Sequence, residues 1–176
     1  IRIAGRSPRT ITVRSTGHGP LLSDVAGAPA GAPDTSDDGQ SYAVSVAWAA
    51  LKPGRTMDGI LGLNVARDPA GVQAAAALFS APAESIVYAT TEHIGFVAAG
   101  SVPTRRGGRT GAFPLDGTWP LPGWSPQADW TGTIEAAKLP RRQDPSDGLL
   151  VAANQQVAAP GDADGAALGG AADTGY

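Results

Sequence analysis

Residues 85–90 (SIVYAT) and residues 93–98 (HIGFVA) are two runs of strand-forming residues joined by a short polar connection. Both runs are rich in β-branched and aromatic side chains, which favour extended backbone. Two such runs with so few residues between them are typical of an antiparallel hairpin. We therefore predict a β-hairpin over residues 85–98.

Two helices are predicted before this hairpin. Residues 56–64 form a short helix with Thr56 as its candidate N-cap. The second helix covers residues 68–79, with Asp68 as the cap and Pro69 at the first helical position, where proline costs no hydrogen bond.

Further strands are predicted on both sides of these elements. Residues 9–15 alternate and contain β-branched side chains. Residues 42–51 are apolar on both faces, so we expect this strand to be covered on both sides. Between them, residues 24–40 are acidic and rich in turn formers, which predicts a mobile loop. Residues 103–128 read as a long ordered Pro- and Gly-rich loop, and residues 149–153 as a last strand.

The composition is short of core-forming bulk. The 176 residues include 24 Gly and 15 Pro, whereas Leu, Ile, Val and Phe make up about a fifth of the chain. A net charge of only −3 and four Trp argue against a disordered chain. The core is therefore expected either to use Ala and Gly or to borrow apolar surface from sequence outside this chain. The start at Ile1, without Met or a signal-like segment, favours an interior piece of something longer.

Several function classes are disfavoured. No apolar run is long enough to span a membrane, and a pI near 5.2 without a basic stripe argues against a nucleic-acid partner. The absence of Cys excludes a disulfide frame or a thiol nucleophile in this chain. Two His residues are too few for a histidine metal cluster.

The clearest chemical feature is the end of the predicted strand at residues 149–153. Three side-chain amides follow it, beginning with Asn154. An amide at a strand end can donate an N–H to a developing oxyanion. The alternative is a turn-forming Asn.

His18 is the candidate general base, with Ser15 or Ser23 as the nucleophile. The alternative is a hydrogen-bonded turn histidine in the sequence His-Gly-Pro. His93 is expected at the tip of the hairpin, in solvent.

Other candidate sites are weaker. Carboxylates that could supply oxygen ligands to Ca²⁺ do not follow an EF-hand pattern, and a solvated acidic surface is the alternative; they are Asp144, Asp147, Asp162 and Asp164. An arginine group could bind an anion or be solvated: Arg105, Arg106 and Arg109. A tryptophan group could form a ligand platform or pin the long loop by packing: Trp119, Trp124 and Trp130.

Five ordered segments resemble the penicillin acylase (penicillin amidase) family. They are Thr16-Gly17-His18-Gly19-Pro20, residues 86–89 (IVYA), residues 94–105 (IGFVAAGSVPTR), the pair PLPGW (120–124) and DWTG (129–132), and residues 139–154 with Leu-Pro, Asp-Pro, Gly and Ala-Asn in the family order. The resemblance spans nearly the whole chain.

The resemblance implies an N-terminal-nucleophile amidohydrolase. Members include penicillin, acyl-homoserine lactone and lipopeptide acylases. Their precursor cleaves itself, and the new N-terminal Ser of the large subunit is the nucleophile. Its own α-amine acts as the base, so the chemistry needs neither histidine nor a cofactor. This chain would be an interior segment of the large subunit, so the Ser lies outside it and the isolated segment is expected to be inactive.

The resemblance also implies roles for particular residues. Asn154 matches the family's Asn that stabilises the oxyanion. Glu84 and Ser85 fall where the family contributes to the acyl pocket. A structural Ca²⁺ in the full-length protein would draw on Asp162 or Asp164, and on a backbone carbonyl near Gly117.

The chain departs from the family pattern in a turn, in a neighbour of the catalytic Asn and in a loop. Thr90-Thr91-Glu92-His93 replaces the family's Asp and Gly in the hairpin turn, which is about one residue shorter, and Gln155 replaces a second Asn. Residues 24–40 carry more Pro and Asp than is usual. These changes bear on substrate preference more than on membership.

The expected fold is α+β. Residues 1–176 would form one partial domain of a four-layer αββα sandwich, mainly antiparallel β with a few short helices and the long Pro/Gly-rich loop. Its partners would be an acyl-amide substrate, the small subunit and the rest of the large subunit, with self-association if the segment is isolated. Family resemblance favours a secreted or periplasmic protein that acts in antibiotic metabolism or on related acyl amides. The rival interpretation is a non-catalytic binding domain descended from the family.

Overall fold

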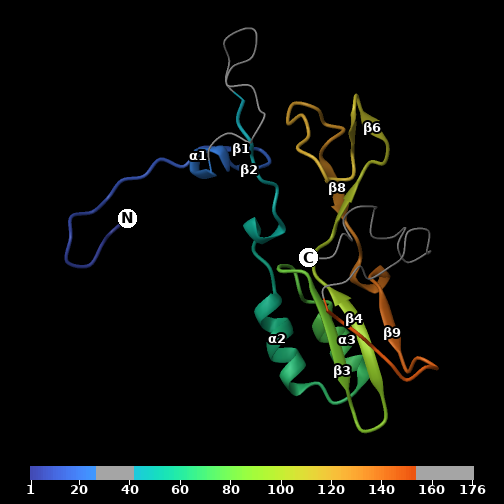
Figure 1. Cartoon of the computed structure of the whole chain (residues 1–176). Coiled ribbons are helices and arrows are strands. Elements are labelled where there is room, and N and C mark those ends of the chain that lie inside the picture. The colour runs from blue at the N-terminus through green and yellow to red at the C-terminus, as the bar shows by residue number, and fades with distance from the viewer. Residues whose placement is uncertain (27–41, 154–176) are drawn as a thin grey trace. The chain divides into compact units, whose positions relative to one another are not determined.

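A computed structural model describes residues 1–26 and 42–153. The chain divides into two compact units, Ile1–Leu51 and Lys52–Tyr176. Figure 1 shows the elements of each unit along the chain. None of the described helices is both long enough and apolar enough to cross a membrane.

The first unit has little regular structure. Strand β1 (Ser15–Thr16) pairs antiparallel with β2 (Gly19–Pro20), followed by helix α1 (Ser23–Ala26) and the 3-10 turn η1 (Ala49–Leu51). The chain around Ser45 runs beside β2: the Val46 N–H donates to the Pro20 carbonyl at 3.0 Å. No described residue of this unit is buried.

Two strand predictions in this unit are wrong. Of residues 9–15 only Ser15 is in a strand, and of residues 42–51 only Ser45 makes a β-bridge. Trp48 is 60% exposed in this chain. Strand-forming residues become a strand only where a second strand takes up their backbone hydrogen bonds and an apolar layer covers a face. The acidic segment begins inside α1, and residues 27–40 of it lie outside the described residues.

The second unit begins with two helices, α2 (Thr56–Val65) and α3 (Pro69–Ala76), which pack together. The Asp68 cap is confirmed, because its side chain accepts a hydrogen bond from the Gly71 N–H at 2.7 Å. Helix α3 ends earlier than predicted, however. The Thr56 cap is wrong: Arg55 occupies the N-cap position, and the Thr56 hydroxyl bonds to another segment.

The hairpin prediction is confirmed. Strand β3 (Glu84–Ala89) pairs antiparallel with β4 (Ile94–Ala99), each within one residue of the expected bounds. Sequence reasoning missed β9 (Arg141–Gln143), which pairs antiparallel with β4 and gives the order β3-β4-β9. In Figure 1 this sheet forms the lower part of the second unit, beside α3.

The core of this unit lies between α3 and one face of the sheet. Val72 and Ala76 of α3 meet Val97 and Ala99 of β4, with partly buried side chains around them: Leu63, Ala66, Phe79, Ile86 and Tyr88. Small residues are therefore part of the core. In a second, smaller cluster, buried Leu139 packs against Ala98, Val102 and Ile134.

The predicted loop at residues 103–128 contains strand pairs. Strand β5 (Pro103–Arg105) pairs with β8 (Trp130–Thr133), and β6 (Arg109–Thr110) pairs with β7 (Phe113–Pro114). Trp119 and Trp124 are 59% and 79% exposed, so they do not pin this segment by burial; Leu115 is buried instead. After the 3-10 turn η2 (Ala136–Lys138) and β9, the strand predicted at residues 149–153 does not form. The described elements give an α+β fold with antiparallel sheets, as predicted.

Candidate functional site

Three of the predicted site residues lie outside the described residues: Asn154, Asp162 and Asp164. The described chain ends at Ala153, directly before Asn154. The site can therefore be built only from the segments that lead to it and from Glu84, Ser85 and Gly117.

Asp144 is the corner from which the chain leaves β9 towards Asn154. Its carboxylate accepts a hydrogen bond from the Ile94 N–H at 3.0 Å, and its Oδ2 lies 2.7 Å from the His93 ring nitrogen Nδ1. The Asp144 N–H donates back to the Ile94 carbonyl at 3.0 Å. Hydrogen bonds from the Gln143 side chain, His93 and the Ile94 N–H lower the pKa of Asp144. His93 and Asp144, which are 51 positions apart in the sequence, thus hold the hairpin next to the end of β9.

Glu84 and Ser85 point to opposite faces of the sheet. Glu84 lies opposite Ala99, and Ser85 lies opposite Ala98. Because side chains alternate along a strand, Glu84 shares the face of Ile86, which packs on the core beside α3. Ser85 shares the other face with Val87, which is 47% exposed. Strand geometry therefore separates the two residues that the family resemblance placed together.

The bend before β3 is held from two sides. The Thr56 hydroxyl accepts a hydrogen bond from the Ser80 N–H at 3.0 Å and donates to the Ala81 carbonyl at 3.1 Å. On the other side, the Ser101 N–H donates to the Ser80 carbonyl at 2.7 Å. Sequence reasoning missed this role of Thr56, since a threonine at a helix start is equally typical of a cap.

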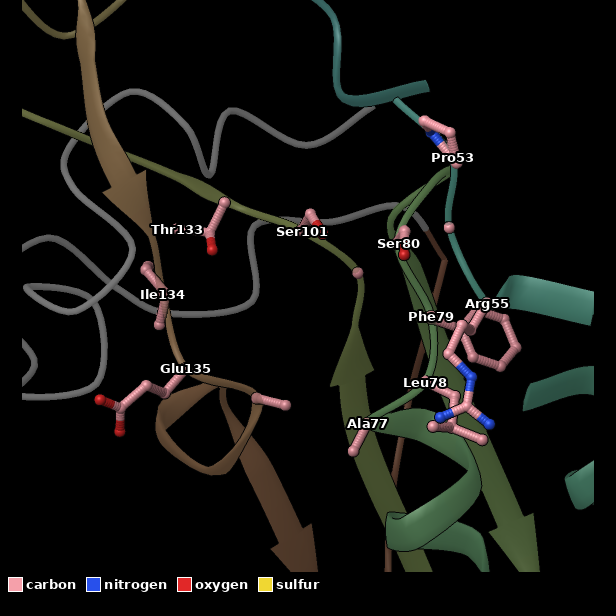
Figure 2. Close-up of a pocket in the computed structure, with 13 residues that line it drawn as sticks. Pro53, Arg55, Ala77, Leu78, Phe79, Ser80, Ser101, Thr133, Ile134 and Glu135 are labelled. Carbon is pink, nitrogen blue, oxygen red and sulfur yellow. The ribbon is translucent and has the colours of Figure 1, made fainter. Parts of the chain in front are cut away.

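The bend also forms a wall of a surface pocket of about 400 Å³. Figure 2 shows Phe79 and Ser80 on one wall, with Pro53 and Arg55 beside them, and Thr133 to Glu135 on the opposite wall. Hydroxyls and a guanidinium mix with apolar side chains around it, so the pocket has no single chemical character.

His18 lies in the turn between β1 and β2. Its N–H donates to the Thr16 hydroxyl at 3.2 Å. The Ser23 hydroxyl accepts a hydrogen bond from the Val44 N–H at 3.2 Å. The backbone of His18 is therefore part of a hydrogen-bonded turn.

Arg105 and Gly117 lie together. The Arg105 guanidinium is 5.9 Å from the centre of the Trp130 ring, and a Cβ on Gly117 would lie 2.9 Å from that guanidinium. Hydrogen bonds from Thr118 lower the pKa of Asp116, and the charge of Arg105 adds to this.

The described residues do not test the calcium ligand expected at the Gly117 carbonyl. The Arg105 guanidinium lies close to Gly117, and its charge also acts on the Asp116 carboxylate beside it. Within residues 1–26 and 42–153, no group of three or more acidic, His or Cys side chains is arranged to hold a metal. A calcium site that draws on Asp162 or Asp164 and on a carbonyl near Gly117 therefore stays a prediction.

A comparison with protein families shows to which family this chain belongs. The model of the penicillin amidase family matches residues 1–173. The chain belongs to the penicillin amidase family. This confirms the resemblance found in the five ordered segments.

Relatives named as acyl-homoserine lactone acylases are similar along most of this chain. Acyl-homoserine lactone acylase QuiP from Pseudomonas fluorescens and the protein of the same name from Pseudomonas aeruginosa are each 30% identical over 159 residues, or 90% of this chain. Penicillin acylase 2 proenzyme from a Pseudomonas species is 39% identical over 67 residues, which is 38% of this chain. The chain spans only 18% of the length of the first two relatives.

A solved penicillin amidase relative has the same fold. Thermostable penicillin G acylase from Alcaligenes faecalis superposes on 90% of this chain with a TM-score of 0.62 at 21% identity. This chain covers 25% of that one. The match supports the α+β fold expected from the resemblance.

Proposed function

We propose that the protein to which this chain belongs hydrolyses the amide between an acyl group and an amine. The observation that carries the proposal is the family match over residues 1–173, together with the acylase names of the relatives. In this proposal the nucleophile is an N-terminal Ser outside the chain, exposed when the precursor cleaves itself.

The proposed reaction needs few groups. The Ser hydroxyl loses its proton to its own α-amine, whose pKa near 8 suits neutral pH, and its oxygen attacks the amide carbon. The proton then passes to the leaving amine, and water releases the acid from the ester. The Asn154 amide would donate an N–H to the oxyanion of both tetrahedral intermediates, a contribution of about 10²–10³ in rate.

We propose N-acyl-homoserine lactones as the first substrate class to test. The relatives named for that activity match 90% of the chain, whereas penicillin acylase 2 matches 38%. Penicillin-type side chains and lipopeptide acyl chains are the other candidates. A small subunit from the same precursor, a structural Ca²⁺ at Asp162 or Asp164, and a secreted or periplasmic location complete the proposal.

The test is turnover by the full-length protein. Acids and amines released from a panel of N-acyl-homoserine lactones, penicillins and lipopeptides are measured by mass spectrometry. Asn154→Ala should lower kcat by about 10²–10³, whereas His18→Ala should leave kcat near that of the wild type. Loss of activity only with His18→Ala, in a folded protein, would contradict the proposal.

The same experiment separates the rival class. A full-length protein that releases no acid from any of these amides, and whose N-terminus after processing is not Ser, would support a non-catalytic binding domain. The isolated 176-residue chain should release nothing, since it holds no N-terminal Ser.

A further inference from the structure

Strand β3 forms one edge of the sheet β3-β4-β9. It pairs with β4 on one side, and within residues 1–26 and 42–153 no strand pairs with its other side. An unpaired edge presents a row of backbone N–H and C=O groups that can pair with another strand. The opposite edge of the same sheet is β9, so the two edges can be compared.

The hydrogen bonds around β4 show which backbone groups of β3 face outward. The Ala98 N–H donates to the Pro140 carbonyl at 2.8 Å, on the β9 side, and the Thr90 N–H donates to the His93 carbonyl at 2.7 Å, on the β3 side. The bonding direction alternates along an antiparallel strand. Ala98 therefore bonds towards β9, and its partner on β3, Ser85, bonds away from β4.

The same alternation holds along the whole of β3. Ile86 and Tyr88 direct their N–H and C=O groups to β4, whereas Ser85, Val87 and Ala89 direct theirs to the outer edge. The side chains alternate with the same period, because those of Ile86 and Tyr88 are partly buried and the other three are exposed. The outer edge therefore offers backbone donors and acceptors beside small or uncharged side chains.

Strand β9 has the features that protect an edge strand from pairing. It is only three residues long, and its Arg141 and Arg142 are exposed. Short length and charged side chains both disfavour pairing with a further strand. Strand β3 has six residues in unbroken register with β4, and it contains no Pro, Lys or Arg. Its one charged residue, Glu84, stands at its first position, so the edge of β3 is suited to pairing and that of β9 is not.

We propose that the outer edge of β3 binds a strand of the same full-length protein, supplied from outside this chain. That strand provides the backbone partners of Ser85, Val87 and Ala89 and extends the sheet beyond β3. The chain spans 18% of the length of the two QuiP relatives and 25% of the solved relative, so most of the length of these proteins lies outside the matched part. The inference does not depend on the proposed function.

A second copy of the chain fits this edge less well than a single strand does. Helix α2 packs on α3, and Figure 1 shows it on the side of the sheet where β3 is the edge. A second copy paired through its own β3 would bring a second α2 to the same side. A single strand brings no helix and needs only the edge itself.

The test is hydrogen exchange of single amides in the full-length protein, followed by mass spectrometry with electron-transfer fragmentation. The amides of Ser85, Val87 and Ala89 should be protected to within about tenfold of those of Ile86 and Tyr88, because a paired strand opens as one cooperative unit. The internal control is β9, where Arg141 and Gln143 direct their N–H groups outward and Arg142 bonds to β4. Their amides should exchange at least about 100-fold faster than that of Arg142.

A proline at each edge provides the matched variants. Proline is tolerated in an edge strand only where the lost N–H faces solvent. Val87→Pro should therefore speed exchange at Ser85 and Ala89 by at least about tenfold, which corresponds to about 1.4 kcal/mol. Val87→Ala keeps the N–H, and Arg141→Pro removes an outward N–H of β9. Both should leave the exchange of their neighbours within about threefold of the wild type.

Fast exchange at Ser85, Val87 and Ala89 in the wild type, with Ile86 and Tyr88 protected, would overturn the inference without any variant. Protection that falls on dilution, together with a dimer mass in light scattering, would also overturn it, since a second copy would then be the occupant. A Val87→Pro variant as harmless as Arg141→Pro would do the same. If Val87→Pro fails to fold, the wild-type exchange decides. Each result is independent of whether the protein hydrolyses any amide.

Discussion

The two compact units of this chain contain similar strand-forming sequence but build very different structures. Among the described residues of Ile1–Leu51, the longest strand has two residues and none is buried. In the second unit β3 and β4 have six residues each. Val97 and Ala99 of β4 are buried against α3.

The difference lies in what covers the strands. Residues 9–15 and 42–51 also contain strand-forming residues. The second segment is hydrogen-bonded to Pro20 and Leu22, but no described residue of either segment is buried. The hairpin has α3 on one face and Leu139 on the other. Apolar alternation predicts a strand only when a partner within reach removes its apolar face from water.

The largest expected effect tests how tightly the second unit is packed. Gly100→Ala should lower the free energy of unfolding by about 2–4 kcal/mol, because Gly100 has a φ of 125° and its new Cβ would lie 2.6 Å from Ala83 Cα. Urea unfolding of the chain, followed by circular dichroism, measures this change.

Gly17→Ala is the control in the first unit. A Cβ there would meet no atom within 4 Å, so the change should stay within about 0.5 kcal/mol. Equal effects of the two variants would show that the contrast between the units is wrong.

A smaller effect is expected from shortening a core side chain. Val97 is 5% exposed, and Val97→Ala should lower the free energy of unfolding by about 2 kcal/mol. The reason is that removing its methyl groups leaves a cavity beside Val72. Val13, 69% exposed in the predicted strand of the first unit, should cost less than about 0.5 kcal/mol as Val13→Ala. The same urea titration compares them. A cost at Val13 equal to that at Val97 would mean that residues 9–15 are covered after all.

The smallest effect concerns acid. The pKa of Asp144 is lowered in the folded chain, so its contribution to stability is complete above the pKa of an unfolded carboxyl and is lost as the pH falls through the folded pKa. The Ile94 N–H donates a hydrogen bond to the Asp144 carboxylate, so its NMR chemical shift reports the protonation of Asp144. We expect this shift to change at a pH below the ordinary pKa of an aspartate.

Asp144→Asn should abolish that titration. The substitution should not change the titration of Asp24 in the first unit. The pKa of Asp24 is lowered separately, by a hydrogen bond from Arg14. A change in the Ile94 amide shift above pH 5, or one that persists in Asp144→Asn, would contradict the hydrogen bond from the Ile94 N–H to Asp144.

The predictions that succeeded rest on local signals. The hairpin at residues 85–98 and the Asp68 cap each depend on residues within a few positions of one another. Family membership was equally accessible, because five short segments in order are specific even where none of them is alone.

The predictions that failed or were missed depend on distant residues. A threonine at a helix start can cap the helix or, as Thr56 does, bond to a segment 24 positions away. The pairing of His93 with Asp144 spans 51 positions and has no local signature. Sequence placed Glu84 and Ser85 in one pocket, and only the strand shows that they face opposite sides.

The sequence by itself determined the family, the α+β class, the hairpin and the capped second helix, because local propensity and ordered motifs are written in neighbouring residues. Tertiary structure alone decided which strand-like segments became strands, where the Thr56 hydroxyl bonds and which face Ser85 occupies. The physical reason is that backbone hydrogen bonds and apolar faces need partners, and a partner's position is set by packing rather than by the segment that needs it.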